Sequence, residues 1–321
     1  MGLNAIGASD GAEPTPWYMR PDQFEMKLSG LRDPETLADA RAFLRDGFVV
    51  LPGSLSADSC DAALDQFRAF ERRNEAVCAA NRDSDGHYPR IVNLHLALPG
   101  LRELFSRNAR ALKLQDFLFG DETVLYTSLF YERGSAQELH RDTPYFCTRP
   151  EYRYFGMWIA LEDVDEDNGP LMVMKGGHLM PELDRGAIAR EIFGSPEDAQ
   201  PNSLAAWVTY QDRVAAEGRQ LGLQVETLPA SRGSTILWHP QLPHGGAPIR
   251  DIARTRFSLV IHTTPVGTPV YHQDAFFDPG RSLPLEPGWS YEATRHRRYA
   301  AHASVSFNHQ QDFEAASLGA F

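Results

Sequence analysis

The spacing of apolar residues near the start of the chain predicts two helices around one short buried strand. Apolar side chains recur at intervals of three and four over residues 36–46, which is the period of a helix with one buried face. Gly47 ends this helix, and the run FVVL at 48–51 predicts a buried strand closed by a Pro-Gly pair. Ser56 is a suitable N-cap for a second helix. The apolar positions of that second helix are Cys60, Ala63, Leu64 and Phe67.

From about residue 121 the chain is dominated by short runs of aromatic and β-branched residues. Such runs favour strands, and Gly, Pro and Asn turns separate them. Helices do not intervene between every pair, so a β-sandwich or barrel is favoured over a doubly wound parallel sheet. The expected strands are 123–133, 154–161, 171–174, 223–228, 234–238 and 255–263.

Three segments flank or interrupt this β-rich part. Residues 1–35 are rich in Gly, Ala, Pro and charge and are expected to form a loosely ordered arm, followed by a single domain over 36–321. Within it, residues 181–222 form an insertion with a helix near 203–220, which could cap a pocket as a lid. Residues 264–321 form a C-terminal extension. Its histidines are not clustered at ligand spacing: His272, His296, His302 and His309.

Charge and cysteine usage narrow the class of protein. The chain has 321 residues, a formal net charge of -12 and a sequence pI near 5.4, so phosphate backbones and anionic lipid surfaces repel it. No stretch reaches the roughly 20 apolar residues that span a bilayer, and the first 30 residues carry no apolar leader segment. These features predict a cytoplasmic protein with a small-molecule substrate and neither a nucleic-acid nor a membrane partner; no pattern specifies an oligomeric state. The three cysteines form no C-x-x-C pair and fit a reducing compartment: Cys60, Cys78 and Cys147.

An imidazole and a carboxylate stand two residues apart in the segment ELHRD. At the end of a strand, His140 and Asp142 would point to the same face, because side chains alternate with period two. The Gly-Gly pair after His244 lets the backbone approach a bound group closely. Two histidines and one carboxylate on one side of a metal suit iron(II) that binds a co-substrate and oxygen together, although zinc accepts the same ligands. The candidates for the third ligand are His178, His239, His244 and His262.

The strand expected at 255–263 carries an arginine on the face that would point inward. Arg256 shares that face with Ser258, Val260 and His262, whereas the opposite face is apolar. An inward guanidinium must find an anion, and arginine binds carboxylates through a planar pair of hydrogen bonds. Arg256 follows His244 by 12 residues, so it could hold the far carboxylate of a dicarboxylate that chelates the metal. A salt bridge to Asp251 is the alternative.

Several blocks, taken in order, resemble the phytanoyl-CoA dioxygenase family over about residues 43 to 263. They are DGFVVLPG, HRDTPYF, WIALEDVDEDNGPLMVMKGGH, PHGGAP and RTRFSLVIH. The resemblance implies a mainly β double-stranded β-helix (a cupin-like jelly roll) with N-terminal helical cover and a helical insertion between strands. It implies iron(II) bound by His140, Asp142 and His244, with O2 and 2-oxoglutarate as co-substrates. The 2-oxoglutarate would contact Arg256, Ser258 and Trp158.

The chain departs from the family at one contact. The family often has Ser two residues after the distal histidine, where this chain has Gly246. Ser128 or Tyr126, on the preceding strand, could supply the missing polar contact to 2-oxoglutarate. The aromatic and basic residues that follow the H-x-D pair are candidates for substrate contacts: Tyr145, Phe146, Arg149 and Arg153.

The resemblance implies a dioxygenase that hydroxylates, or otherwise oxidises, an unactivated C–H bond of a small metabolite and releases succinate and CO2. Asp142 favours this reaction over halogenation, because related halogenases replace the carboxylate by Ala or Gly. Desaturation and ring closure use the same ligands. Two other interpretations remain open from the residues: a zinc-dependent hydrolase in which Arg256 has no role, and a non-catalytic jelly-roll binding module.

Overall fold

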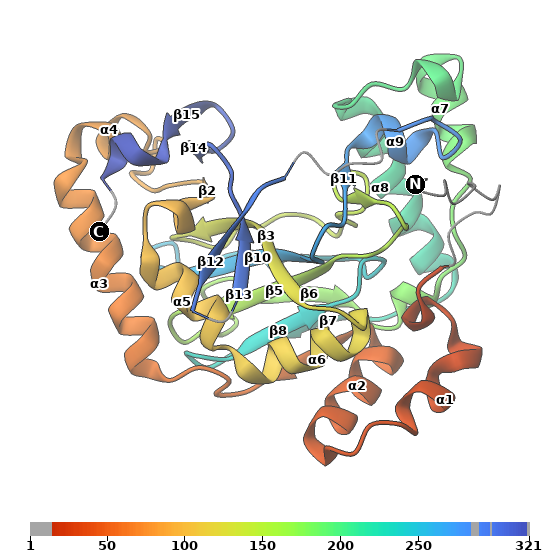
Figure 1. Ribbon diagram of the computed structural model, residues 1–321. Coiled ribbons are helices and arrows are strands. Elements are labelled where there is room, and N and C mark those ends of the chain that lie inside the picture. The colour runs from red at the N-terminus through yellow and green to blue at the C-terminus, as the bar shows by residue number, and fades with distance from the viewer. Residues whose placement is uncertain (1–14, 284–288, 296, 320–321) are drawn as a thin grey trace, which may run out of the picture.

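The computed structural model of the protein describes residues 15–283, 289–295 and 297–319. Most strands belong to one large, mainly antiparallel sheet (Figure 1). In spatial order it runs through β1 (Phe48–Leu51), β8 (Thr235–Trp238), β5 (Phe155–Ala160), β10 (Ser258–Pro265), β3 (Thr123–Tyr131), β2 (Ile91–Val92), β14 (Ser304–Phe307) and β15 (Gln311–Glu314). The hairpin of β12 (Tyr291–Thr294) and β13 (Arg297–Ala300) joins this sheet through β3.

A smaller antiparallel sheet completes the barrel. It consists of β7 (Val225–Leu228), β6 (Leu171–Met174) and β9 (His244–Gly246). Trp158 and Ile236 of the large sheet share one buried apolar cluster with Leu171 and Val173 of the small sheet. Two antiparallel sheets packed over a common core form a jelly roll, so the predicted fold class is confirmed. A separate short ladder joins β4 (Cys147–Thr148) to β11 (Val270–Tyr271).

Strand β10 separates the core from the cavity. Leu259 and Ile261 pack into the main hydrophobic core, whereas Arg256, Val260 and His262 line the cavity on the other side. This alternation matches the two faces predicted for the segment. The strand begins later than predicted, at Ser258, because the Phe257 amide donates to the Glu162 carboxylate (2.7 Å) instead of to a neighbouring strand.

Helices cover the outer side of the large sheet (Figure 1). Their apolar faces and the outer face of β10 and β3 form the main core, in which Phe43, Phe67, Phe105 and Phe130 are buried. The helices predicted at 36–46 and after Ser56 are present, and the Ser56 hydroxyl accepts from the Ser59 amide as an N-cap. The covering helices are α1 (Phe24–Leu28), α2 (Pro34–Asp46), α3 (Ala57–Arg73), α4 (Glu75–Ala80), α5 (Pro99–Arg107) and α6 (Ala109–Phe119).

The expected loose arm at 1–35 is corrected in its second half; residues 1–14 lie outside the described part. Short helices begin at Trp17, and Tyr18 is buried. The Tyr18 hydroxyl donates to the Tyr152 carbonyl (2.9 Å), and the Trp17 indole donates to the Leu118 carbonyl (2.9 Å). Two aromatic side chains with satisfied polar ends hold this segment against the domain although its composition is loop-like.

The insertion and part of the C-terminal extension pack together at one end of the molecule (Figure 1). The insertion contains α7 (Arg185–Phe193) and α8 (Leu204–Gln220), which agrees with the helix predicted at 203–220. The extension contributes α9 (Gln273–Phe277), and Phe276 and Phe277 contact Tyr210 of α8. Across the described ranges, no helix is long and apolar enough to cross a membrane.

Candidate active site

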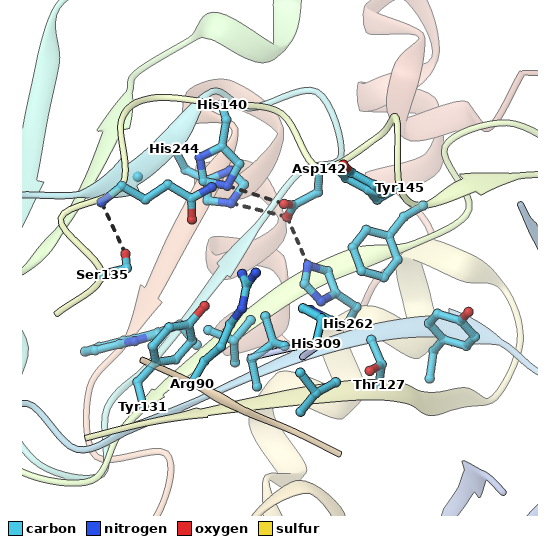
Figure 2. Close-up of a pocket in the computed structure, with 18 of the residues that line it drawn as sticks. Arg90, Thr127, Tyr131, Ser135, His140, Asp142, Tyr145, His244, His262 and His309 are labelled. Carbon is cyan, nitrogen blue, oxygen red and sulfur yellow. Dashed lines mark hydrogen bonds and ion pairs between the residues drawn. The ribbon is translucent and has the colours of Figure 1, made fainter. Parts of the chain in front are cut away.

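A two-bond bridge between distant segments brings two histidines together. The His140 amide donates to the His244 carbonyl (2.8 Å), and the His244 amide donates to the His140 carbonyl (3.0 Å). His244 begins β9, and His140 belongs to the loop after β3, so this isolated bridge fixes their separation. The predicted strand end at 138–142 is therefore reduced to one bridging residue, yet His140 and Asp142 still face a common point (Figure 2).

Three side chains offer donor atoms that converge. One atom each from His140, Asp142 and His244 lies within 4.8 Å of the others. The Nδ1 atoms of both histidines donate to backbone carbonyls, at 2.8 Å to Glu138 and 3.0 Å to Leu242. In each ring Nε2 is therefore the nitrogen that faces Asp142 and is available to bind a metal. The donor set and its orientation fit iron(II), which favours two histidines and a carboxylate with open positions.

A fourth residue, His262, contacts the Asp142 carboxylate without belonging to the group of converging donors. Its Nε2 lies 2.9 Å from Asp142 Oδ2, whereas His244 Nε2 lies 3.2 Å from the same oxygen and His140 Nε2 lies 3.4 Å from Oδ1. Burial alone would raise the pKa of Asp142, but the His244 and His262 imidazoles and hydrogen bonds from His140 and His244 hold the pKa well below its usual range. Asp142 is thus an anion placed to receive a cation.

Arg256 is buried on the same inner face without an acidic partner. One terminal nitrogen donates to the Gly169 carbonyl (2.8 Å), and Nε has no hydrogen-bond partner among the described residues. Among the described residues, Arg256 forms no ion pair with Asp251 or with another acid. The guanidinium lies 5.7 Å from the centre of the Trp158 ring. Burial lowers the pKa of Arg256 to about 10, so the group still carries its charge near neutral pH.

These groups line one cavity of about 710 Å³ (Figure 2). Its size is typical of pockets that take drug-sized ligands. His140, Asp142, His244, Arg256 and Trp158 all line it, whereas Ser258 does not, although its buried hydroxyl has no partner in the described ranges. Four residues of the insertion also line the cavity: Pro201, Asn202, Leu204 and Trp207.

The residues predicted to contact substrate divide into two groups. Tyr145 and Phe146 line the cavity; Phe146 stacks on His262, with ring centres 3.9 Å apart. Arg149 does not line it, because its guanidinium donates to the Thr148 and Ala275 carbonyls and to Glu151. Arg153 does not line it either. The structure therefore does not bring these two arginines to the cavity, because the backbone after Asp142 leads both away from its lining.

The polar replacement suggested for the missing serine also needs correction. The Ser128 hydroxyl pairs with His95 Nδ1 (2.7 Å) on the outer side of β3, away from the cavity, whereas Tyr126 does line it. A side chain at Gly246 would lie 2.8 Å from the Ser135 hydroxyl oxygen. Ser135 therefore fills the space that a serine at 246 would need, and it lines the cavity. The loop 135–138 packs against β9, and no local sequence pattern predicts this contact.

Sequence reasoning missed several cavity residues. Arg90 precedes β2, and Tyr131 ends β3; both point into the cavity (Figure 2). His302 and His309 of the C-terminal extension also line it, as does His272, whereas His296 lies outside the described part. None of these belongs to the group of converging metal donors. Only the inward alternation of β3 could have pointed to Tyr131.

Comparison with known proteins agrees with this geometry. A profile of the phytanoyl-CoA dioxygenase family matches residues 43–257. A relative from Bos taurus, phytanoyl-CoA dioxygenase domain-containing protein 1, is 24% identical over 296 residues, which cover 76% of this chain and 95% of that protein. Ectoine dioxygenase from Sphingopyxis alaskensis is 29% identical over 155 residues, which cover 45% of this chain and 50% of that protein.

Solved structures share the fold. The epimerase SnoN from nogalamycin biosynthesis, in complex with Fe3+, alpha ketoglutarate and nogalamycin RO, has a TM-score of 0.58 at 20% identity, covering 84% of this chain and 99% of SnoN. EctD from S. alaskensis with 2-oxoglutarate and 5-hydroxyectoine has a TM-score of 0.53 at 18% identity, covering 80% and 86%.

Fold, donor set and profile together define an iron(II)- and 2-oxoglutarate-dependent dioxygenase. The chain belongs to the phytanoyl-CoA dioxygenase family.

Proposed function

We propose that His140, Asp142 and His244 hold iron(II), and that Arg256 binds the far carboxylate of 2-oxoglutarate in the same cavity. One observation carries the proposal: three preoriented donors within 4.8 Å share a cavity with a buried guanidinium that has no acidic partner in the described ranges. An unpaired buried guanidinium is costly, and a carboxylate satisfies it through two parallel hydrogen bonds. Trp158 forms the wall beside this guanidinium.

Bound iron(II) would supply activation of O2: one oxygen atom enters succinate as 2-oxoglutarate loses CO2, and the other enters the substrate. The protein residues position the reactants and exclude water. Trp207 of the insertion and Tyr145, whose rings lie 4.8 Å apart, form the cavity wall on the side of the insertion. The Asp142 carboxylate leaves no ligand position for chloride, which supports hydroxylation or a related oxidation over halogenation. Capping by residues 181–222, including any lid motion, remains a prediction.

The proposed substrate is a small metabolite with an unactivated C–H bond. The cavity volume of about 710 Å³ leaves room for such a molecule beside 2-oxoglutarate. Phe146, Tyr126 and Tyr145 supply apolar surface for it. A cytoplasmic location is part of the proposal, supported by three buried free cysteines; the acidic net charge of -12 argues against a nucleic-acid partner.

The assembly of the site is tested by the visible charge-transfer band of the iron–2-oxoglutarate chelate. Apo-protein is mixed anaerobically with iron(II) and increasing 2-oxoglutarate. The wild-type protein should develop the band, and Asp142→Ala should need more iron(II) to develop it because one ligand is lost. Arg256→Leu should require about 10- to 100-fold more 2-oxoglutarate, as expected for the loss of a charged hydrogen-bond pair.

Arg250→Leu is the matched control, because Arg250 lies on the same connection but is exposed and paired with Glu166. Its 2-oxoglutarate requirement should equal that of the wild type. Absence of the band in the wild type would refute the proposed site. An unchanged requirement in Arg256→Leu would move the carboxylate contact to another residue. Metabolites that accelerate succinate formation then identify the substrate.

A further inference from the structure

The charges that line the cavity do not balance. Among its described lining residues, Asp142 is the single carboxylate, whereas Arg90 and Arg256 both carry guanidinium groups. If the proposed function holds, iron(II) and the 2-oxoglutarate dianion cancel each other, and Asp142 offsets one guanidinium. One positive charge is left over. A partly enclosed cavity strengthens such a charge, because the effective dielectric constant is lower there than in water.

Arg90 is the guanidinium that remains. Its side chain points into the cavity on the side of the His140, Asp142 and His244 group (Figure 2). Its Nε is buried without a hydrogen-bond partner, and no ion pair to an acid is found for Arg90 in the described ranges. A hydrogen bond and its positive charge act on the neighbouring Tyr131 hydroxyl. Arg90 therefore has the chemistry of an anion receptor with free donors.

Part of the wall around Arg90 comes from the C-terminal extension. The Asn308 amide donates to the Arg90 carbonyl (3.0 Å), and Phe307 of β14 pairs with Ile91 of β2. His309 and His302 of the same extension line the cavity. The family match ends at residue 257, well before this wall. Arg90 itself lies inside the match, but residues beyond it hold its backbone, and such a position suits recognition of the primary substrate better than of the co-substrate.

Aromatic side chains form another part of the cavity wall. Phe146 and Tyr126 meet edge to face with ring centres 6.0 Å apart, and Tyr145 packs on Trp207. Burial raises the pKa of Tyr131, so its hydroxyl stays protonated near neutral pH and can donate beside Arg90. A single leftover charge matches a carboxylate better than a phosphate monoester, which carries nearly two negative charges.

We propose that Arg90, with Tyr131 beside it, binds a carboxylate of the primary substrate, so that the enzyme oxidises an apolar carboxylic acid. This inference rests on the proposed function, because the leftover charge is counted with iron(II) and 2-oxoglutarate bound. The guanidinium anchors the acid at one end of the cavity, and the aromatic walls direct its apolar body past the metal centre.

The test measures binding of paired probes to the anaerobic protein loaded with iron(II) and 2-oxoglutarate. The probes are phenylacetate, 2-naphthylacetate and 1-adamantylacetate, each beside its neutral amide, and calorimetry gives the Kd values. At least one acid should bind the wild type about tenfold or more tightly than its amide. Arg90→Leu should abolish this preference, Arg90→Lys should retain part of it, and Arg107→Leu on the exposed face of α5 should retain all of it.

The Kd of 2-oxoglutarate, read from the charge-transfer band, separates the failures. Arg90→Leu should leave it within about threefold of the wild-type value, in contrast to Arg256→Leu. If Arg90→Leu raises that Kd as Arg256→Leu does, Arg90 serves the co-substrate and the proposal is overturned. It is also overturned if no acid binds the wild type better than its amide. Absence of the band in the wild type would instead refute the proposed function itself.

Discussion

Replacing His262 by Leu tests whether the metal centre depends on a residue that does not bind the metal. His262 Nε2 lies 2.9 Å from Asp142 Oδ2; His262 is buried and Asp142 is half-buried. His140 and His244 also face the carboxylate, but their Nε2 atoms are the proposed metal donors and must release it when the metal binds. Among the described contacts of the Asp142 carboxylate, His262 alone can keep donating a hydrogen bond to it in the loaded site.

The expected loss follows from this geometry. A hydrogen bond to a charged group contributes about 1.5–3 kcal/mol, and each 1.4 kcal/mol corresponds to about tenfold in affinity. His262→Leu should therefore raise the Kd for a divalent metal by about 10- to 100-fold, the range found when groups that orient metal ligands are removed. His262→Gln retains an N–H donor near the position of Nε2 and should lose much less.

Cobalt(II) is a suitable probe, because its visible absorption reports both binding and coordination number. Apo-protein is titrated with cobalt(II), and near-UV circular dichroism confirms that each variant is folded. An unchanged Kd in His262→Leu would refute the reasoning. Equal losses in His262→Leu and His262→Gln would show that the ring packing against Phe146, with centres 3.9 Å apart, matters more than the hydrogen bond.

Three other changes test links between the fold and the site. Gly156→Ala would place a Cβ 1.9 Å from the Trp238 ring, and the centre of that ring lies 4.6 Å from the centre of the His244 ring. We expect a loss of about 1–3 kcal/mol in unfolding free energy, measured by urea unfolding. We also expect weaker metal binding, measured by cobalt titration. Burial lowers the pKa of His178 to about 4, so the unfolded chain binds the proton more tightly, and stability is full above about pH 6.5 and falls as the pH drops toward 4. His178→Asn should therefore lose about 2 kcal/mol less than the wild type between pH 7.5 and pH 5 in urea unfolding. Arg256→Lys should bind 2-oxoglutarate about tenfold more weakly than the wild type, because an ammonium group cannot form the two parallel hydrogen bonds of a guanidinium; equal affinity would exclude a bidentate contact.

Local pattern was enough for the elements that depend on local physics. The alternation in β10 predicted which side chains face the cavity and which enter the core, because neighbouring side chains of a strand point to opposite faces. The Ser56 N-cap was predicted for the same kind of reason, since a cap needs only residues within one turn. The packed segment at Trp17 and Tyr18 was not, because its hydrogen bonds reach residues more than 100 positions away.

The sequence by itself determined the chemistry of this protein: a histidine and a carboxylate two residues apart, and an inward arginine 12 residues after a second histidine. The tertiary structure decided which histidine completes the donor set, because only the bridge between His140 and His244 brings distant segments together. It also turned Arg149 away and Arg90 inward. These choices depend on contacts between segments far apart along the chain, which no local spacing records.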